Sequence, residues 1–305
     1  MTAERPEGIE ADYPLERLTT IRVGGEADFF ATAEDEGSLV ELLAWADQAD
    51  IAIAVVGSGS NLLVSDAGFR GLVLKMGGGL AEVSHAGTVV TAGGGARLPS
   101  VAAKVANWGL SGLEFGVNIP GTVGGAVRMN ANAYGGELGE VLTDVSVCTP
   151  SGVEERDPSS LGLRYRGSNL GDAEVVSAAR FSLTERSPDE IKAVMASMRE
   201  KRKEAQPSGI KTFGSTFVNP SAQEAAGRSA GMLLDEAGCR GLTVGGARLS
   251  PKHANFVENF DGASAGDVLA VMAAARRRVR EQFGVTLEPE VQVLGEVDWP
   301  EDWDE

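Results

Sequence analysis

Residues 112–139 read GLEFGVNIPGTVGGAVRMNANAYGGELG, and the rest of the chain is best interpreted around this stretch. It is dense in glycine and other small residues, contains no Lys and has a single Arg, Arg128. Glycine weakens helices and strands because it loses more backbone freedom on folding than other residues, but it lets the backbone approach another group closely. We therefore expect a long loop whose N–H groups bind an anionic ligand. A purely structural loop is the alternative.

The composition is that of a globular protein with room for more than one core. The 305 residues predict two or three domains, and the 43% hydrophobic and 23% charged content is ordinary. The net charge of −17 disfavours nucleic acid or an anionic membrane as a partner. The sequence shows neither a signal-peptide pattern nor an apolar run of about 20 residues, so we expect a cytoplasmic protein.

Neither the cysteines nor the histidines predict a metal site. Cys148 and Cys239 share no metal-like spacing, and we expect them to be reduced and partly buried. His85 and His253 lie far apart in the sequence, which makes a histidine-based site improbable. Nothing in the sequence indicates a protein partner.

A βαβ-like unit opens the chain. Strands are expected at 26–32 and 51–56, and apolar residues spaced on one face predict a helix at 36–48 between them. The sequence GSGSN follows at 57–61, where small residues expose backbone N–H groups that suit a phosphate. Because it matches neither the G-x-G-x-x-G nor the Walker pattern, neither mechanism transfers, and a simple turn is the alternative.

Periodicity and capping residues predict the elements that follow. We expect strands at 71–76, 141–149, 173–183, 255–257 and 287–294, and helices at 99–108, from Pro188 onwards, at 228–237 and at 264–283. Ser264 is the expected N-cap of the last helix and Gly284 its stop. The sequence QPSG at 206–209 predicts a domain boundary, and the acidic tail at 298–305 is expected to be frayed.

Several sequence blocks together resemble one known family. They are TTIRVGG (19–25), VVGSGSNLLVSD (55–66), NIPGTVGGAVRMNANAYGGELGE (118–140), YRGS (165–168), GSTFVNP (214–220), AGMLLDEAG (230–238), HANF (253–256) and LEPEV (287–291). In this order they resemble the UDP-N-acetylenolpyruvoylglucosamine reductases, the MurB-type flavoenzymes of peptidoglycan precursor synthesis. Each block alone is modest, but the ordered set is highly specific and covers nearly the whole chain.

The resemblance implies an α+β fold. A flavin-binding fold of the vanillyl-alcohol-oxidase (PCMH) type would form two subdomains, 1–76 and 77–206. A substrate-binding α+β domain at 207–297 and the tail at 298–305 would follow. The chain has no tyrosine between Arg166 and Ser215, so it is similar to the shorter class of the family, which lacks a tyrosine-bearing loop.

The resemblance also implies the chemistry. FAD would carry hydride from NADPH to the enolpyruvyl methylene carbon of the sugar nucleotide, and protonation of the resulting carbanion would give UDP-N-acetylmuramate. Arg166 matches the residue for the substrate carboxylate, to which a planar bidentate donor is suited. Ser215 matches the proton donor, which must be tightly positioned because serine is a poor acid. Glu290 matches the family's glutamate, with Glu288 as its nearby competitor.

Binding residues follow from the same alignment of motifs. FAD contacts are predicted at Gly57, Ser58, Gly59, Ser60, Asn61, Ile119, Pro120, Gly121, Thr122, Gly125 and Asn130. Substrate contacts are predicted at Asn219 and Tyr165. Apart from the resemblance, Asn219 would form an Asx turn before Pro220 and Tyr165 would be a packing residue.

Three positions depart from the family pattern. Asn132 stands where the family usually has Gly, and Asn is the residue best able to replace Gly at a positive φ. Val218 and Gln292 each replace a usual basic residue. Two other functions therefore stay open, which are a different FAD oxidase or dehydrogenase of the same superfamily and a catalytically silent nucleotide-binding protein.

Overall fold

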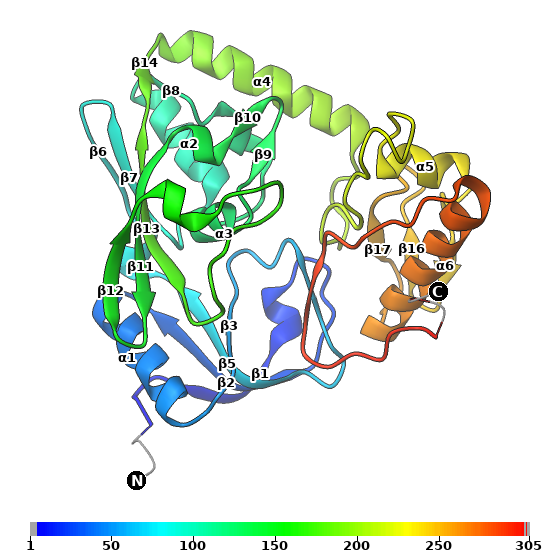
Figure 1. The fold of residues 1–305 in the computed structure, drawn as a ribbon, viewed down its shortest axis with the longest axis horizontal. Coiled ribbons are helices and arrows are strands. Elements are labelled where there is room, and N and C mark those ends of the chain that lie inside the picture. Colours follow the sequence, from blue (N-terminus) through cyan, green and yellow to red (C-terminus); the bar gives the residue numbers. More distant parts are fainter. Residues whose placement is uncertain (1–4, 302, 304–305) are drawn as a thin grey trace. The chain divides into compact units, whose positions relative to one another are not determined.

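The structure is a computed structural model that describes residues 5–301 and 303 (Figure 1). The chain divides into two units. The first comprises Met1–Asp12, Asp28–Ser58 and Arg70–Arg202, and the second comprises Tyr13–Ala27, Gly59–Phe69 and Lys203–Glu305. Each unit is therefore built from segments that lie far apart in the sequence. The expected division into two flavin-binding subdomains, a third domain and a tail stays a prediction.

The elements mix helices and sheets, as expected. The α-helices are α1 (Glu36–Gln48), α2 (Leu98–Asn107), α3 (Val123–Arg128), α4 (Pro188–Ala205), α5 (Ala230–Glu236) and α6 (Ala265–Phe283). The strands are β1 (Glu10–Pro14), β2 (Glu26–Ala33), β3 (Ile53–Val55), β4 (Leu62–Val64), β5 (Phe69–Met76), β6 (Val83–Ala86), β7 (Val89–Gly93), β8 (Leu110–Ser111), β9 (Asn132–Ala133), β10 (Gly136–Glu137), β11 (Leu142–Thr149), β12 (Gly152–Arg156), β13 (Val175–Ser182), β14 (Thr184–Glu185), β15 (Thr243–Val244), β16 (Ala247–Leu249), β17 (Val257–Asn259) and β18 (Gln292–Leu294).

A four-stranded sheet with the order β1-β2-β5-β3 supports the N-terminal part of the first unit. Helix α1 begins with a capping box in which Asp35 accepts from the Ser38 N–H and the Ser38 hydroxyl accepts from the Asp35 N–H. The expected apolar face of α1 is buried in a core shared with β2 and β5. The expected strand-helix-strand unit is therefore present, although β5 lies between β2 and β3 in the sheet.

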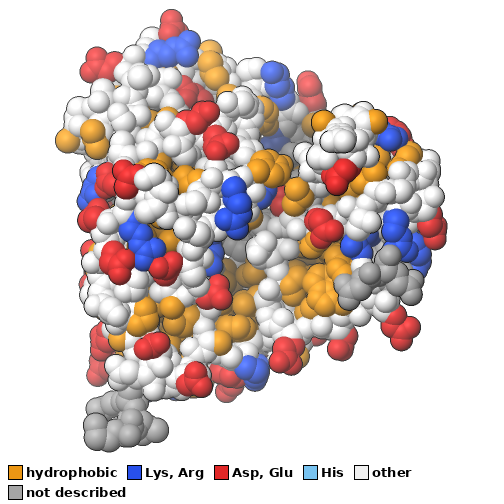
Figure 2. All heavy atoms as spheres, in the orientation of Figure 1, with side chains coloured by type: hydrophobic (Ala, Val, Ile, Leu, Met, Phe, Trp, Pro, Cys, Tyr) orange, Lys and Arg blue, Asp and Glu red, His pale blue; other side chains and the backbone are white. Residues whose placement is uncertain are grey.

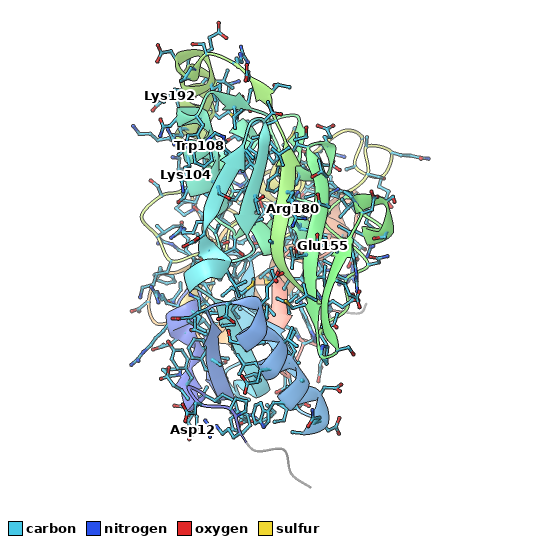
Figure 3. All side chains as sticks on the ribbon, turned by 90° about the vertical axis from the view of Figure 1, so that its left-hand side faces the viewer. Asp12, Lys104, Trp108, Glu155, Arg180 and Lys192 are labelled. Carbon is cyan, nitrogen blue, oxygen red and sulfur yellow. The ribbon has the colours of Figure 1, made fainter. Side chains whose placement is uncertain are left out.

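A five-stranded antiparallel sheet, ordered β12-β11-β13-β7-β6, forms the rest of the first unit. Apolar side chains of α2 and α3 share one core with β7, β11 and β13. Away from this core, Arg180 on β13 pairs with Asp144 on β11 and with Glu155 on β12, at 2.7 Å from the latter (Figure 3). The hydrogen bond from Arg180 holds the pKa of Glu155 below its ordinary value.

The glycine-rich stretch contains a short helix that the sequence analysis did not predict. Helix α3 lies within it, and the Gly124 N–H donates to the Gly94 carbonyl at 2.8 Å. A Cβ on Gly124 would lie 3.1 Å from the Val176 carbonyl oxygen on β13. The glycine suits this position because a side chain there would crowd the sheet backbone. Part of the stretch therefore serves packing, not ligand approach.

The second unit combines a three-stranded antiparallel sheet, β15-β16-β17, with the parallel pair β4 and β18. Helices α5 and α6 pack with these strands around one core. Ser264 is the N-cap of α6, as expected, and forms a capping box with Asp267. Gly284 ends the helix at a φ of 67°, as expected of a stop glycine.

The tail is not frayed where the structure describes it, contrary to expectation. Trp303 is only 9% exposed and packs against the core of the second unit. The Arg276 guanidinium lies over the Trp303 ring, 4.8 Å from its centre, and donates to the Trp303 carbonyl. The acidic residues of the tail favour a frayed end, whereas the buried Trp303 holds it against the core.

The surface agrees with the acidic composition. In Figure 2, Lys and Arg side chains lie singly or in small groups among Asp and Glu.

Cys148 and Cys239 are free and buried, and burial raises the pKa of the Cys148 thiol to about 11. No helix in the described part of the chain is long and apolar enough to span a membrane. Among the same residues, no cluster of His, Cys, Asp or Glu could hold a metal ion.

Candidate functional site

The two stretches predicted to hold FAD meet at Gly57 and Thr122. A Cβ built on Gly57 would lie 2.5 Å from the Thr122 hydroxyl oxygen, closer than real Cβ atoms approach. Thr122 is itself tied to Arg97 by an isolated antiparallel bridge. The turn that follows β3 therefore lies directly against the glycine-rich stretch within the first unit. The sequence analysis predicted both stretches but not this contact.

Gly59 holds the rest of the 57–61 turn in place within the second unit. Its φ is +61°, and a Cβ there would lie 1.9 Å from the Leu18 carbonyl oxygen. The Gly59 carbonyl accepts from the Thr20 N–H at 3.0 Å. The Thr20 hydroxyl donates to the Thr212 carbonyl at 2.6 Å, which links this turn to the chain just before Ser215. The glycine at this position is required by both conformation and space.

Two of the glycines in residues 119–125 have open space beside their Cα atoms. Nothing lies within 4 Å of a Cβ built on Gly121, and Gly125 has only the Thr122 hydroxyl nearby, at 3.5 Å. Gly125 is exposed, and the segment from Ile119 to Gly121 is half-buried. A ligand bound here would meet backbone at these two glycines, and contact of this segment with FAD stays a prediction. The Val123 and Gly124 N–H groups, however, already donate to carbonyls of Ala96 and Gly94.

Arg166 lies in a tight turn that fixes its backbone. Arg164 and Gly167 exchange two backbone hydrogen bonds, of 3.0 and 3.1 Å, around it. Its φ is 57°, which costs a non-glycine residue about 1–2 kcal/mol. The guanidinium lies 4.9 Å from the centre of the Tyr165 ring, and Tyr165 is 51% exposed. Such backbone outliers cluster at functional sites, so the conformation supports a role for Arg166.

Two asparagines of the glycine-rich stretch brace the Arg166 turn. The Asn132 carbonyl Oδ1 accepts from Arg166 Nη1 at 3.1 Å. Asn130 is 1% exposed and donates to the Arg164 carbonyl at 3.4 Å, and its Oδ1 accepts from the Gly139 N–H at 3.2 Å. The amide of Asn130 is thus engaged within the protein, and its contact with FAD stays a prediction.

Asn132 does not adopt a positive φ in the structure. Asn132 belongs to β9, and the non-glycine residues with positive φ nearby are Asn130 and Tyr134, at 41° and 53°. Asn132 therefore does not have to imitate a glycine. Its hydrogen bond with Arg166 was not predicted, because contacts between distant loops leave no local signal in the sequence.

Ser215 and Glu290 come together within the second unit. Thr216, next to Ser215, donates its N–H to the Asn255 carbonyl at 2.8 Å and accepts at its carbonyl from the Glu290 N–H, also at 2.8 Å. An isolated bridge pairs Ser215 with Phe256. The GSTF segment at 214–217 thus lies between the HANF and LEPEV segments. Both Ser215 and Glu290 are half-buried.

Asn61 is hydrogen-bonded to the segment that carries Glu290. Its Nδ2 donates to the Glu290 carbonyl at 3.1 Å, and its own carbonyl accepts from the Gln292 N–H at 3.0 Å. Ser60 lies beside Gly214, whose added Cβ would be 3.6 Å from the Ser60 carbonyl oxygen. A predicted FAD segment and two predicted catalytic residues therefore share one part of the second unit.

Glu288, the competitor of Glu290, occupies a different environment. Its side chain is 70% exposed and lies 3.8 Å from Arg276 Nη2. Its carbonyl accepts from the Val218 N–H at 2.9 Å. Exposure and the cationic neighbour suit a surface ion pair, which favours Glu290 for the chemical role.

Asn219 has a structural contact that the sequence did not predict. Its Oδ1 accepts from the Ala230 N–H at 3.0 Å, at the start of α5. The bond reaches a residue distant in sequence, unlike the Asx turn that was the alternative interpretation. Contact between Asn219 and a substrate diphosphate stays a prediction, as does that of Tyr165.

Comparison with known proteins decides the family. A family model described as UDP-N-acetylenolpyruvoylglucosamine reductase, C-terminal domain, matches residues 206–294, and an FAD binding domain model matches residues 27–156. A UDP-N-acetylenolpyruvoylglucosamine reductase of Agathobacter rectalis is 44% identical over 97% of this chain and 97% of its own length. The chain belongs to the UDP-N-acetylenolpyruvoylglucosamine reductase family. The family predicted from the sequence blocks is thereby confirmed.

Other members of the UDP-N-acetylenolpyruvoylglucosamine reductase family agree. The enzyme of that name from Syntrophomonas wolfei is 38% identical over 95% of this chain and 96% of its own. A crystal structure of UDP-N-acetylenolpyruvylglucosamine reductase (MurB) from Thermus caldophilus matches with a TM-score of 0.80 and 36% identity, over 94% of this chain and 98% of that one. The expected α+β flavin-binding fold with a C-terminal domain is confirmed, and the protein is an FAD-dependent oxidoreductase.

Proposed function

We propose that this protein reduces the enolpyruvyl group of UDP-N-acetylenolpyruvoylglucosamine with NADPH and forms UDP-N-acetylmuramate for peptidoglycan precursor synthesis. The observation that carries the proposal is the hydrogen bond from the Glu290 N–H to the carbonyl of Thr216, the residue after Ser215, in a chain of this family. The tight Arg166 turn supplies a permanently charged residue for the substrate. We place the reaction in the cytoplasm, where free thiols such as those of Cys148 and Cys239 persist.

The residues that hold FAD in this proposal are those of the two glycine-rich segments, 57–61 and 119–125. When bound, FAD accepts hydride from NADPH and passes it to the enolpyruvyl methylene carbon. The open space at Gly121 and Gly125 leaves the backbone accessible to the cofactor. Because these segments carry no Lys or Arg, binding would rest on backbone dipoles and the hydroxyls of Ser58, Ser60 and Thr122.

Three side chains then act on the substrate. Arg166 binds its carboxylate, where negative charge accumulates as the methylene carbon gains hydride. Ser215 gives the proton to the adjacent carbon and recovers one from solvent, so hydride and proton together complete the lactyl ether. Glu290 orients or polarises the groups around Ser215. Asn219 and Tyr165 are proposed to contact the sugar nucleotide.

A single assay tests the proposal. The purified protein is reconstituted with FAD, and NADPH oxidation is followed with and without UDP-N-acetylenolpyruvoylglucosamine. Oxidation that depends on the sugar nucleotide, with UDP-N-acetylmuramate as its product, is the expected result. A yellow protein without such turnover would point to a different FAD oxidoreductase. Protein that takes up no FAD would contradict the assignment of the cofactor.

A further inference from the structure

The backbone that carries Ser215 is held by hydrogen bonds outside any regular strand. Residues 214–218 form no regular strand, and isolated bridges at Ser215 and at Phe217 are their only strand-like pairings in the described part of the chain. Proton transfer from a weak acid such as serine demands accurate placement. The groups that hold this segment therefore bear directly on the proposed reaction.

Asn255 supplies most of that support on one side of the segment. Its side chain is buried, with 4% exposed, and it pairs with both backbone groups of Phe217. Oδ1 accepts from the Phe217 N–H at 2.9 Å, and Nδ2 donates to the Phe217 carbonyl at 2.9 Å. The Asn255 carbonyl also accepts from the Thr216 N–H at 2.8 Å. One residue thus makes three hydrogen bonds to the two residues that follow Ser215.

The side-chain amide does here what a neighbouring strand would do. It presents one donor and one acceptor side by side, as a peptide group does. An ionised carboxylate could serve the Phe217 N–H but not its carbonyl, and an aliphatic side chain could serve neither. Burial makes the match more important, because an unpaired backbone group inside a protein is costly.

Asn255 is itself held in place by His253. Its N–H donates to Nδ1 of His253 at 3.2 Å, and the His253 ring packs edge-on against Phe256. On the opposite side of the segment, the Thr216 carbonyl accepts from the Glu290 N–H. A chain of hydrogen bonds therefore runs from His253 through Asn255 and Thr216 to Glu290, and Ser215 directly precedes Thr216 in the sequence.

We propose that Asn255 is a positioning residue for the reaction: its paired hydrogen bonds to Phe217 hold the Ser215 hydroxyl in place for proton transfer. The inference rests on the proposed function. It assigns no contact between Asn255 and substrate or FAD. The proposal predicts different effects on the two half-reactions. Flavin reduction by NADPH does not need Ser215, whereas flavin reoxidation by the enolpyruvyl substrate does.

The test uses Asn255→Asp in the FAD-loaded protein, with each half of the reaction measured per bound flavin. At pH 8 the carboxylate cannot donate to the Phe217 carbonyl. Reoxidation by UDP-N-acetylenolpyruvoylglucosamine should then slow by about tenfold to a hundredfold, the scale of a small misplacement. Flavin reduction by NADPH should stay within about twofold of the wild-type rate, because that half-reaction does not need an accurately placed Ser215. As the pH falls the carboxyl gains a proton, becomes both donor and acceptor, and the reoxidation rate should recover relative to wild type.

Asn259→Asp is the matched control. Asn259 is buried in the same unit and also uses its amide as donor and acceptor, to the Ile21 carbonyl at 3.0 Å and from the Ala263 N–H at 2.9 Å. Its side chain makes no contact with the Ser215 segment in these bonds. Both half-reactions of Asn259→Asp should match wild type per bound flavin, even if the variant melts at a lower temperature.

The outcomes separate the possibilities. If Asn255→Asp and wild type reoxidise their flavin at equal rates at pH 8, the proposal is overturned. It is also overturned if Asn259→Asp slows flavin reoxidation as much as Asn255→Asp does. Asn255→Ser, whose single hydroxyl oxygen does not present a donor and an acceptor on two neighbouring atoms as the amide does, should slow reoxidation without restoring it at low pH. If both Asn255 variants lose flavin while Asn259→Asp keeps it, Asn255 holds the domain together instead, and the proposal fails. Wild-type flavin that the sugar nucleotide does not reoxidise would refute the proposed function itself.

Discussion

Asn132 Oδ1 accepts a hydrogen bond from Arg166 Nη1 at 3.1 Å, which joins the glycine-rich stretch to the turn that carries the proposed carboxylate-binding residue. The amide of Asn132 is a neutral acceptor for the guanidinium. A hydrogen bond to a charged group contributes about 1.5–3 kcal/mol. Asn132 is thus a means of orienting Arg166 that the sequence analysis did not foresee.

Asn132→Ala should weaken the use of substrate. Without the amide the guanidinium loses its orientation, and kcat/KM for the enolpyruvyl sugar nucleotide should fall by about tenfold to a hundredfold. Flavin reduction by NADPH should be unchanged, because it does not involve the substrate carboxylate. Steady-state kinetics and anaerobic flavin reduction measure the two effects. A variant with wild-type kcat/KM would show that this hydrogen bond does not orient Arg166 for catalysis.

Gly59→Ala and Gly121→Ala form a matched pair in the two predicted FAD segments. The methyl group at Gly59 would collide with the Leu18 carbonyl in a backbone conformation of positive φ, so the apoprotein should unfold at a lower temperature. The methyl group at Gly121 meets no protein atom within 4 Å. Gly121→Ala should therefore melt like wild type in the apo form but bind FAD more weakly. Unchanged FAD affinity in a folded Gly121→Ala protein would place the cofactor elsewhere.

Ser215→Ala should separate the two halves of the reaction. NADPH should still reduce the bound flavin, whereas reoxidation by the sugar nucleotide should slow by about 10²- to 10⁴-fold, the usual contribution of a general acid. Thr216→Val is the control, because the buried Thr216 hydroxyl has no hydrogen-bond partner among the described residues. That variant should keep both half-reactions and its stability. Near-normal turnover by Ser215→Ala would refute Ser215 as the proton donor.

His253 should make stability depend on pH. Burial lowers the pKa of its imidazole below the ordinary 6.5, and the nearby Arg240 charge lowers it further, while Asp235 opposes this. Nδ1 also accepts from the Asn255 N–H and must be unprotonated to do so. The unfolded chain therefore binds a proton that the folded one does not, and the stability contribution is lost as the pH falls below about 6.5.

The variant His253→Gln isolates this effect. Urea unfolding at several pH values between about 7 and 5 should show a steeper loss of stability in wild type than in His253→Gln, because the glutamine does not titrate. Each unit by which the pKa is lowered corresponds to about 1.4 kcal/mol. Parallel pH profiles for the two proteins would show that His253 titrates alike in the folded and unfolded states.

The sequence was most informative where the signal is local. The capping residue Ser264 and the stop Gly284 placed α6 within one residue at its start, because caps act on adjacent backbone groups. Helix α3 was missed because its glycines argue against helix formation, whereas one of them, Gly124, lies against the backbone of β13. Strand β12 was missed as well, since most of its residues are exposed and carry no apolar alternation.

The same contrast between local sequence signals and tertiary contacts holds for the site residues. Motif order was sufficient to select Ser215, Glu290 and Arg166 as candidates, but not the residues that hold them. The support from Asn132 and Asn255 comes from segments 34 and 38 residues away in the chain. Such contacts depend on tertiary structure, and a single sequence holds no spacing rule for them.

The most direct test of the central claim is a single turnover without oxygen. The FAD-loaded protein is reduced with one equivalent of NADPH and then mixed with UDP-N-acetylenolpyruvoylglucosamine, while the flavin absorbance is recorded and the product is identified by mass. We predict that the flavin is reoxidised and that UDP-N-acetylmuramate forms in an equal amount. Flavin that stays reduced in the presence of the sugar nucleotide, yet is reoxidised by oxygen, would contradict the account.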